Sequence, residues 1–344
     1  MYKVLVLATS RKTRGGITSV VKAHEQGDQW RDYHCKWVAT HRDGCFFLKM
    51  FYLLSGFLQF IVYLPFCKLL HVHFSEPPSA IRKRLFIKIA TLLHKKIIVH
   101  FHSFSPETTI YGKHEKIYEY IFHAADIVIV LSEYWKKCVE EKFHLGEKLR
   151  VVYNPCTTEI YQTQFPKKKQ ILYAGTLNER KGYWDLIKAF SLIHGKYPEW
   201  RIVFAGNGEI SKATERASSA GVLGQTDFLG WINGQEKDRV FKESMVFCLP
   251  SYAEGFSMAV LDAWAYGLPV ITTPVGGIPD VAKDGENILL FSPGDVSSLS
   301  KCLDRLLSDK ILTGNISRAS LVLAERFSID KINSQIGDLY SKLL

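Results

Sequence analysis

The sequence lacks the short motifs of several common site classes. No Cys-x-x-Cys pair occurs among its seven scattered cysteines. That absence disfavours a zinc ribbon, a redox motif or a disulfide framework, and it fits a reducing cytosol. The spacing of a Walker A loop is missing, which excludes a P-loop. No Asp-x-Asp occurs either, which disfavours a carboxylate-held divalent ion at a nucleotide diphosphate.

Long apolar runs are also scarce. The run within residues 1–8 is too short for a signal peptide and predicts a buried strand. One stretch, residues 50–67, approaches membrane length, but it includes Gln59 and Pro65 and lies between two predicted strands. A membrane span needs about 20 apolar residues. The stretch therefore predicts a helix packed on a sheet, and a transmembrane helix is the alternative.

The chain does contain ample core material and an uneven distribution of charge. Apolar residues make up 47% of the 344 residues, enough for two cores of roughly 150 residues each. Residues 1–165 hold 23 Lys and Arg against 14 Asp and Glu, whereas residues 166–344 hold 21 against 20. The positive field therefore belongs to the first half, where it would attract nucleic acid, an anionic membrane or a phosphorylated ligand.

Short β-branched runs alternate with helical patterns along both halves of the chain. Strands are expected at 3–8, 33–39, 69–73, 96–100, 127–131 and 150–153, and then at 171–174, 201–205, 227–229, 246–249 and 270–273. Such alternation builds parallel sheets with helices on both faces. The expected fold class is α/β, with two facing doubly wound, Rossmann-like domains at 1–163 and 164–328. A polar linker is expected at 162–169, and a C-terminal helix at 329–344 is expected to pack back on the first domain.

Unusual residues follow the carboxyl ends of the predicted strands, where open parallel sheets bind ligands. In the first half these are Gly15-Gly16 and His102. Gly16 would begin a helix, whose free backbone N–H groups bind anions, and an ordinary turn is the alternative. In the second half, Gly206-x-Gly208 has Ser211 in place of the third glycine of a dinucleotide fingerprint, so no NAD site is expected.

Charged residues follow the strands of the second half. Arg180 and Lys181 precede a helix and could bind a diphosphate, or they could form a solvated basic turn. Glu254 lies in a loop before a helix, and Asp262 lies about two turns further on. The first carboxylate could accept hydrogen bonds from sugar hydroxyls and the second could reach a ribose. The alternative is that Glu254 is a surface acid and Asp262 a partner on the helix surface.

Two histidine pairs alternate along predicted strands, His71 with His73 and His100 with His102, so each pair shares one face. Four imidazoles suggest a metal, but only Glu76 offers a nearby carboxylate. No metal site is therefore expected.

A series of motifs resembles the group 1 transferases, the retaining glycosyltransferases of family 4, which have the GT-B architecture. The motifs are Gly175-x-Leu177-x3-Lys181-Gly182, Gly206-x-Gly208, Glu254-Gly255-Phe256, Gly276-Gly277-Ile278-Pro279 and Asp284-Gly285-x-Asn287. The resemblance covers nearly the whole chain and is most specific over residues 171–294. It implies transfer of a sugar from a UDP- or GDP-sugar with retention of configuration, without a cofactor or a metal.

The resemblance also implies roles for individual residues. The implied catalytic residues are His102 near the reacting bond, Lys181 at the leaving diphosphate and Glu254 at the sugar hydroxyls. The implied donor-binding residues are Gly16, Arg180, Gly206, Phe256, Ser257, Met258 and Asp262, with Trp231 and Ile232 as weaker candidates for the base pocket. Two positions depart from the family pattern: Thr176 replaces a frequent arginine, and Asp262 replaces a second glutamate.

Positive charge and an apolar stretch in the first half of the chain indicate the kind of acceptor. The positive first half, the stretch 50–67 and the basic segment 80–96 favour a lipid-linked or oligosaccharide acceptor at an anionic membrane surface. The expected place is the cytoplasm, peripheral at the inner face of the cell membrane, in surface polysaccharide synthesis. A nucleic-acid partner is not expected, since no known binding motif occurs. The alternatives are a sugar-nucleotide epimerase, a phosphorylase and a non-catalytic sugar-nucleotide-binding subunit.

Overall fold

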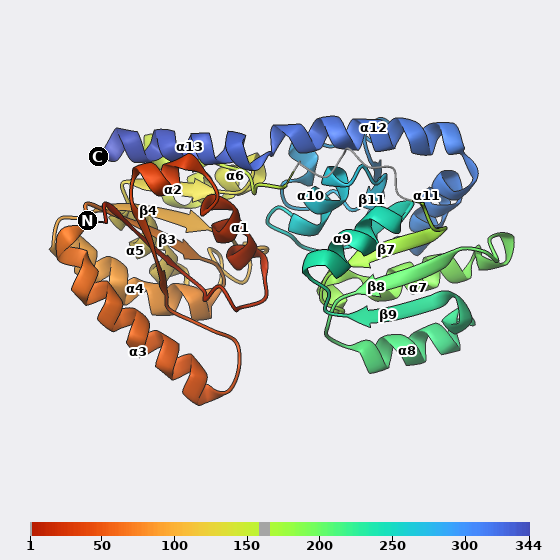
Figure 1. Ribbon diagram of the computed structural model, residues 1–344, viewed down its shortest axis with the longest axis horizontal. Coiled ribbons are helices and arrows are strands. Elements are labelled where there is room, and N and C mark those ends of the chain that lie inside the picture. Colours follow the sequence, from red (N-terminus) through yellow and green to blue (C-terminus); the bar gives the residue numbers. More distant parts are fainter. Residues whose placement is uncertain (1, 158–165) are drawn as a thin grey trace. The chain divides into compact units, whose positions relative to one another are not determined.

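The computed structural model describes residues 2–157 and 166–344, which form two compact units (Figure 1). One unit comprises Met1–Pro155 together with Ser328–Leu344, and the other comprises Cys156–Phe327. The domain boundary expected after residue 163 lies outside the described residues, as does the first part of the expected linker.

The first unit contains a six-stranded parallel sheet in the order β2-β1-β3-β4-β5-β6. Its strands are β1 (Val4–Ala8), β2 (Cys35–Ala39), β3 (Leu69–Phe74), β4 (Lys96–Phe101), β5 (Ile127–Val130) and β6 (Leu149–Val151). Its helices are α1 (Gly16–His24), α2 (Asp28–Asp32), α3 (Phe46–Tyr63), α4 (Pro77–Leu92), α5 (Glu115–Ala124), α6 (Glu133–Phe143) and α13 (Ile329–Leu343). The strands expected in this half are all confirmed, with ends shifted by one or two residues.

Apolar side chains cover both faces of this sheet. Every residue of β1 and β3 is buried, as expected for parallel strands with helices on both sides. One core cluster contains Phe86 of α4 and Trp135 of α6. The opposite cluster joins Val6 of β1 to Ile332 and Ile336 of α13. The last helix of the chain therefore closes one face of the first sheet (Figure 1).

The second unit repeats the design with a parallel sheet in the order β12-β11-β10-β7-β8-β9. Its strands are β7 (Gln170–Ala174), β8 (Arg201–Ala205), β9 (Thr226–Gly230), β10 (Val246–Leu249), β11 (Val270–Thr272) and β12 (Leu289–Leu290). Its helices are α7 (Tyr183–Ser191), α8 (Ile210–Ser219), α9 (Gly234–Glu243), α10 (Met258–Ala265), α11 (Val296–Ser308) and α12 (Lys310–Arg326). The five expected strands are confirmed, and the two-residue β12 was not expected.

The apolar stretch at 50–67 forms most of α3, and the helix is exposed along most of its length. Only Gly56 and Phe60 of α3 are buried. A Cβ atom at Gly56 would lie 2.4 Å from the Ala39 oxygen of β2, so the helix packs closely on the edge of the sheet there. By length and composition, Phe46–Phe66 could also cross a membrane. The expected packing on the sheet is confirmed for one side of the helix only.

Candidate functional site

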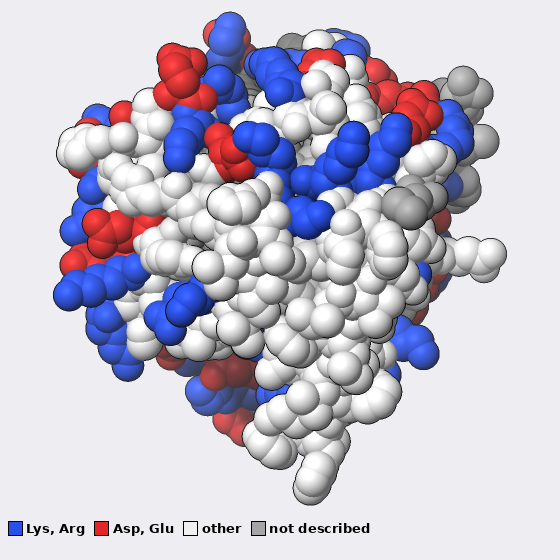
Figure 2. Space-filling view, turned by 90° about the vertical axis from the view of Figure 1, so that its left-hand side faces the viewer, with Lys and Arg blue, Asp and Glu red and all other residues white. Residues whose placement is uncertain are grey.

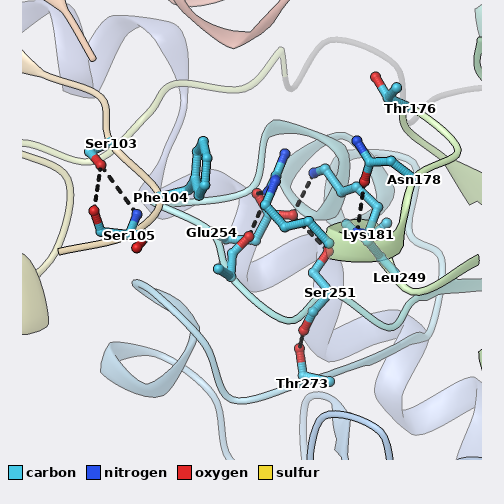
Figure 3. A network of polar contacts seen from close by, with 12 residues as sticks. Ser103, Phe104, Ser105, Thr176, Asn178, Lys181, Leu249, Ser251, Glu254 and Thr273 are labelled. Atoms are coloured by element: carbon cyan, nitrogen blue, oxygen red, sulfur yellow. Dashed lines mark hydrogen bonds and ion pairs between the residues drawn. The ribbon is translucent and has the colours of Figure 1, made fainter. Parts of the chain in front are cut away.

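Lys181 and Glu254 form the centre of a polar network in the second unit (Figure 3). The Lys181 Nζ atom lies 2.5 Å from Glu254 Oε1, and Arg180 Nη1 lies 3.5 Å from Glu254 Oε2. The Ser251 hydroxyl donates to the same Oε1 atom over 2.7 Å. Two of the implied catalytic residues, with Arg180, are therefore brought together by the fold.

Two loops after neighbouring strands build this network. Lys181 ends a short 3-10 turn after β7, in which its backbone N–H donates to Asn178 Oδ1 over 3.0 Å. Glu254 lies in the loop after β10, which pairs with β7 in the sheet. The Tyr252 N–H donates to the Arg180 carbonyl over 2.7 Å, which ties the two loops together.

Gly182 fixes the backbone where the first of these loops enters α7. Its φ is +67°, a left-handed conformation that glycine adopts without strain. A Cβ atom there would also lie 1.9 Å from the Pro250 carbonyl oxygen of the second loop. The glycine of the Lys-Gly motif thus holds the two loops at close range.

Glu254 is charged although it is only 9% exposed. Burial by itself raises the pKa of this carboxyl, but the charges of Lys181 and Arg180 act against burial, as do the hydrogen bonds from Lys181 and Ser251. The net effect lowers the pKa of Glu254 below its ordinary value of 4.5. The site therefore holds a buried carboxylate between two cations.

Gly206 and Gly208 serve backbone packing in the same unit. A Cβ atom at Gly206 would lie 1.8 Å from the Gly175 oxygen, and one at Gly208 would lie 2.3 Å from the Leu177 oxygen. Gly208 has a φ of +119°. The Gly-x-Gly segment thus lets the loop after β8 approach the loop after β7. No dinucleotide site needs to be invoked for it.

The start of α10 carries the next group of implied donor-binding residues. Ser257 is its N-cap, and the Ser257 Oγ atom is buried without a hydrogen-bond partner among the described residues. Phe256 is buried and packs edge-on against Phe327, with ring centroids 5.2 Å apart. Met258 is the first helical residue and is half-buried. The free N–H groups of a first helical turn bind anions.

Asp262 has a partner that sequence reasoning missed. The Lys237 Nζ atom of α9 lies 2.7 Å from Asp262 Oδ2, and both side chains are partly exposed. This ion pair agrees with the alternative interpretation of Asp262 as a partner on the helix surface. A ribose reached by Asp262 would share this carboxylate with Lys237.

The two candidates for the base pocket follow β9 but differ in exposure. Trp231 is 41% exposed, whereas Ile232 is 8% exposed. Gly230 before them has a φ of +68°, which turns the chain out of the strand. Trp231 therefore presents a side chain at the surface, while the Ile232 side chain is part of the core and can offer only its backbone to a ligand.

The implied residues of the first unit lie after β1 and β4. Gly16 begins α1, and Gly15 before it has a φ of +145°, so glycine is required at Gly15 for conformational reasons. His102 follows β4, and its Nε2 atom lies 2.9 Å from His73 Nδ1. Burial, then the proximity of His24, lowers the pKa of His102 to about 3. His102 is therefore a neutral imidazole at physiological pH.

Glu76, the carboxylate expected near the histidines, forms hydrogen bonds with hydroxyl groups of the loop after His102. Its Oε1 atom accepts from the Ser103 hydroxyl over 2.7 Å, and its Oε2 atom accepts from the Thr108 hydroxyl over 2.5 Å. The Ser103 hydroxyl also binds Ser105 of the same loop (Figure 3). Glu76 thus fixes the loop that follows His102.

Besides Lys237, sequence reasoning missed two further site residues, Ser251 and Asn178. Ser251 lies in the loop that carries Glu254, and Asn178 lies three residues before Lys181. Asparagine is a strong N-cap former, so an N-cap at Asn178 was detectable from the sequence. The bond from Ser251 depends on the loop's conformation and leaves no pattern in the sequence.

Two family models match the chain. Glycosyltransferase Family 4 matches residues 7–160, and Glycosyl transferases group 1 matches residues 158–321. An uncharacterized glycosyltransferase of Haemophilus influenzae is 27% identical over 60% of this chain and 59% of its own length. The lipopolysaccharide core biosynthesis glycosyltransferase LpsE of Rhizobium meliloti is 30% identical over 51% of this chain and 49% of its own length. The chain thus spans less than two thirds of either relative.

A solved structure has the same fold. Anabaena HepE in complex with UDP-glucose superposes with a TM-score of 0.80 at 18% sequence identity. The superposition covers 99% of this chain and 100% of that chain. The two-sheet architecture is therefore that of the GT-B proteins.

Proposed function

Because the chain belongs to glycosyltransferase family 4, the group 1 transferases, we propose that it moves a sugar from a UDP- or GDP-sugar to a glycan acceptor in polysaccharide or glycolipid synthesis. The observation that carries the proposal is the buried Lys181–Glu254 pair with Arg180 beside it. HepE, which has this fold, binds UDP-glucose. LpsE is a lipopolysaccharide core biosynthesis glycosyltransferase.

The charges of the network fit the charge that develops in such a transfer. Cleavage of a sugar–phosphate bond leaves negative charge on the diphosphate, and fixed cations stabilise it where it forms. A lysine ammonium has three donors, so Lys181 can bind Glu254 and a phosphate oxygen together. Glu254 keeps Lys181 in place and offers its own oxygens to sugar hydroxyls. No metal takes part in this proposed chemistry.

The proposed outcome at the anomeric carbon is retention. A neutral His102 can contact the donor sugar as a hydrogen-bonding group without adding positive charge beside the developing oxocarbenium ion. The acceptor then attacks from the face that the diphosphate leaves, without a protein nucleophile. The first turn of α10 supplies further N–H groups for the phosphates.

The proposed acceptor is lipid-linked and is met at a membrane surface. We define the apolar face as the exposed large apolar residues of α3 and α4, namely Phe46, Phe47, Met50, Phe51, Leu54, Leu58, Ile61 and Val62 with Ile81, Leu85 and Leu92. Figure 2 shows a broad uncharged surface on this side of the molecule, bordered by Lys and Arg. Arg84 and Lys88 of α4 are exposed beside it, but Lys83 is not part of that border. Lys83 is 2% exposed and donates to the Thr40 hydroxyl.

A binding and turnover experiment tests the function. Thermal unfolding with UDP-, GDP- and ADP-sugars should show stabilisation by one donor class, because a ligand that binds only the folded state raises its stability. The Lys181→Ala variant should fold, lose that stabilisation and lose turnover by about 10²–10³-fold. Full turnover in Lys181→Ala contradicts the assignment. Analysis of the product separates transfer from epimerisation and phosphorolysis, and binding without turnover would indicate a non-catalytic subunit.

A further inference from the structure

Five histidines gather in the interior of the first unit, on the face of the sheet that α13 covers. His71 and His73 lie on β3, and His100 lies on β4 directly beside His73. The ring centroids of His73 and His100 are 4.9 Å apart, and those of His71 and His73 are 4.4 Å apart. His24 of α1 and His102 complete the group. Buried polar groups cost free energy unless they have a partner.

Most of the inward nitrogens of this histidine cluster have no partner. The Nε2 atoms of His71, His73 and His24 and both ring nitrogens of His100 are buried without a hydrogen bond to any residue that the structure describes. His71, His73 and His100 are each about 1% exposed. Native proteins leave few such atoms unsatisfied, and each one calls for an explanation.

Two other ring nitrogens of the cluster, one on His71 and one on His24, are held by oxygens of α13. His71 Nδ1 lies 2.7 Å from the Tyr340 hydroxyl, and His24 Nδ1 lies 2.8 Å from Asn333 Oδ1. Histidines that bind metals characteristically donate the other ring N–H to an oxygen, which fixes the tautomer and leaves Nε2 as the ligand.

We propose that His71, His73 and His100 bind one first-row transition-metal ion of the zinc class inside the first unit. One ligand nitrogen from each of the three lies within 4.8 Å of the others. Imidazole nitrogens suit zinc, copper, iron and nickel, and three histidines with an open fourth position are an established zinc arrangement. Zinc–nitrogen bonds are about 2.0–2.1 Å long, so the rings of His71 and His100, which are stacked at 3°, would have to turn toward the ion when it binds.

The ion would also determine the tautomer of His102. A His73 that binds metal through Nε2 carries its proton on Nδ1, which then donates to His102 Nε2 over 2.9 Å. A neutral His102 that accepts at Nε2 carries its own proton on Nδ1. The site proposed here lies in the interior of the first unit, and it does not depend on the proposed function.

Metal content and stability test the site on the full chain. Protein purified without chelator should contain close to one equivalent of metal by elemental mass spectrometry. After chelation, Co²⁺ should give the visible bands of a four-coordinate ion at one equivalent. Free Zn²⁺ at 100 times its Kd should raise Tm by about 5–10 °C. A wild-type chain without stoichiometric metal or Co²⁺ bands overturns the proposal.

The His100→Phe variant separates a metal site from a histidine core. Replacement of His100 removes two unpartnered nitrogens, so the metal-free variant should be as stable as the metal-free wild type. It should lose the Co²⁺ bands and the Zn²⁺-dependent rise in Tm. The exposed His123 provides the matched control, and His123→Asn should keep both. Equal metal binding by His100→Phe assigns the ion to other histidines and overturns the proposal.

Discussion

Glu254 is a buried carboxylate that keeps its charge because positively charged and hydroxyl donors surround it. Removal of one partner from a buried ion pair typically costs about 3–5 kcal/mol, because the other charge is left without compensation. We therefore expect Glu254→Gln to lower the free energy of unfolding by about 3 kcal/mol near pH 7. Chemical denaturation of the variant and the wild type measures the difference.

The difference in the free energy of unfolding between the wild type and Glu254→Gln should depend on pH in one direction. The pKa of Glu254 is lower in the folded chain than its ordinary value of 4.5, so the folded state favours the ionised form. The stabilisation is complete above pH 4.5 and is lost as the pH falls through the folded pKa. Because glutamine does not titrate, the gap between the variant and the wild type should close below pH 4.5. A gap that widens in acid contradicts the assignment.

A surface pair provides the control for this prediction. The Lys169 Nζ atom lies 2.7 Å from Glu199 Oε1, about the same separation as in the buried pair, but both side chains are about half exposed. Exposed ion pairs contribute only about 0–1 kcal/mol. Glu199→Gln should therefore change the stability little. A loss of stability in Glu254→Gln that is absent in Glu199→Gln would show that burial of the ion pair is the cause of the loss.

At the level of elements, the loops that follow β7 and β8 depend on glycine for their close approach. A Cβ atom at Gly206 would meet the Gly175 oxygen at 1.8 Å, and backbone cannot move aside as a flexible side chain can. Overpacking of this kind typically costs about 1–3 kcal/mol. We expect Gly206→Ala to destabilise the chain by about that amount and to weaken donor binding, as measured by denaturation and donor titration.

Gly224 provides the matched control at this level. A Cβ atom there would have nothing within 4 Å, and its φ is not in the positive range. Gly224→Ala should therefore leave the stability and donor binding unchanged. Equal effects of the two substitutions would show that contact with Gly175 is not the cause.

The elements themselves were largely predictable from the sequence. Buried parallel strands such as β1 and β10 are continuous apolar runs, which the sequence displays directly. The two-residue β12 has no such run. The pair between Lys237 and Asp262 joins different helices, so no local spacing reveals it. An 18-residue apolar helix such as α3 has the same pattern whether it is buried or exposed, and only its packing distinguishes the two.

At the scale of the whole molecule, the excess of positive charge and the exposed apolar face both belong to the first unit. Phe47 is 82% exposed and Leu58 is 66% exposed, both on the apolar face, and Arg84 and Lys88 lie beside them on α4. Burial of a side chain of this size in lipid yields about 1.5–3 kcal/mol. We expect co-sedimentation with vesicles that contain an anionic phospholipid at low salt, and at least a tenfold loss of binding in Phe47→Ser combined with Leu58→Ser.

A matched substitution on the second unit serves as the control for membrane binding. Ile311 of α12 is 79% exposed and lies outside the apolar face. Ile311→Ser should keep the affinity of the wild type for vesicles. Absence of binding to anionic vesicles at low salt would refute the membrane part of the proposal and leave the donor assignment intact.

The placement of α13 has a consequence for the order in which the chain is synthesised. Ser328–Leu344 belongs to the first unit, although all of Cys156–Phe327 is made before it. A nascent first unit therefore lacks the part of its core that α13 supplies, Ile332 and Ile336 beside Val6, while the second unit emerges. Incomplete domains with exposed apolar surface aggregate readily and are typical clients of chaperones. The contiguous second unit can complete its fold on the ribosome before the first.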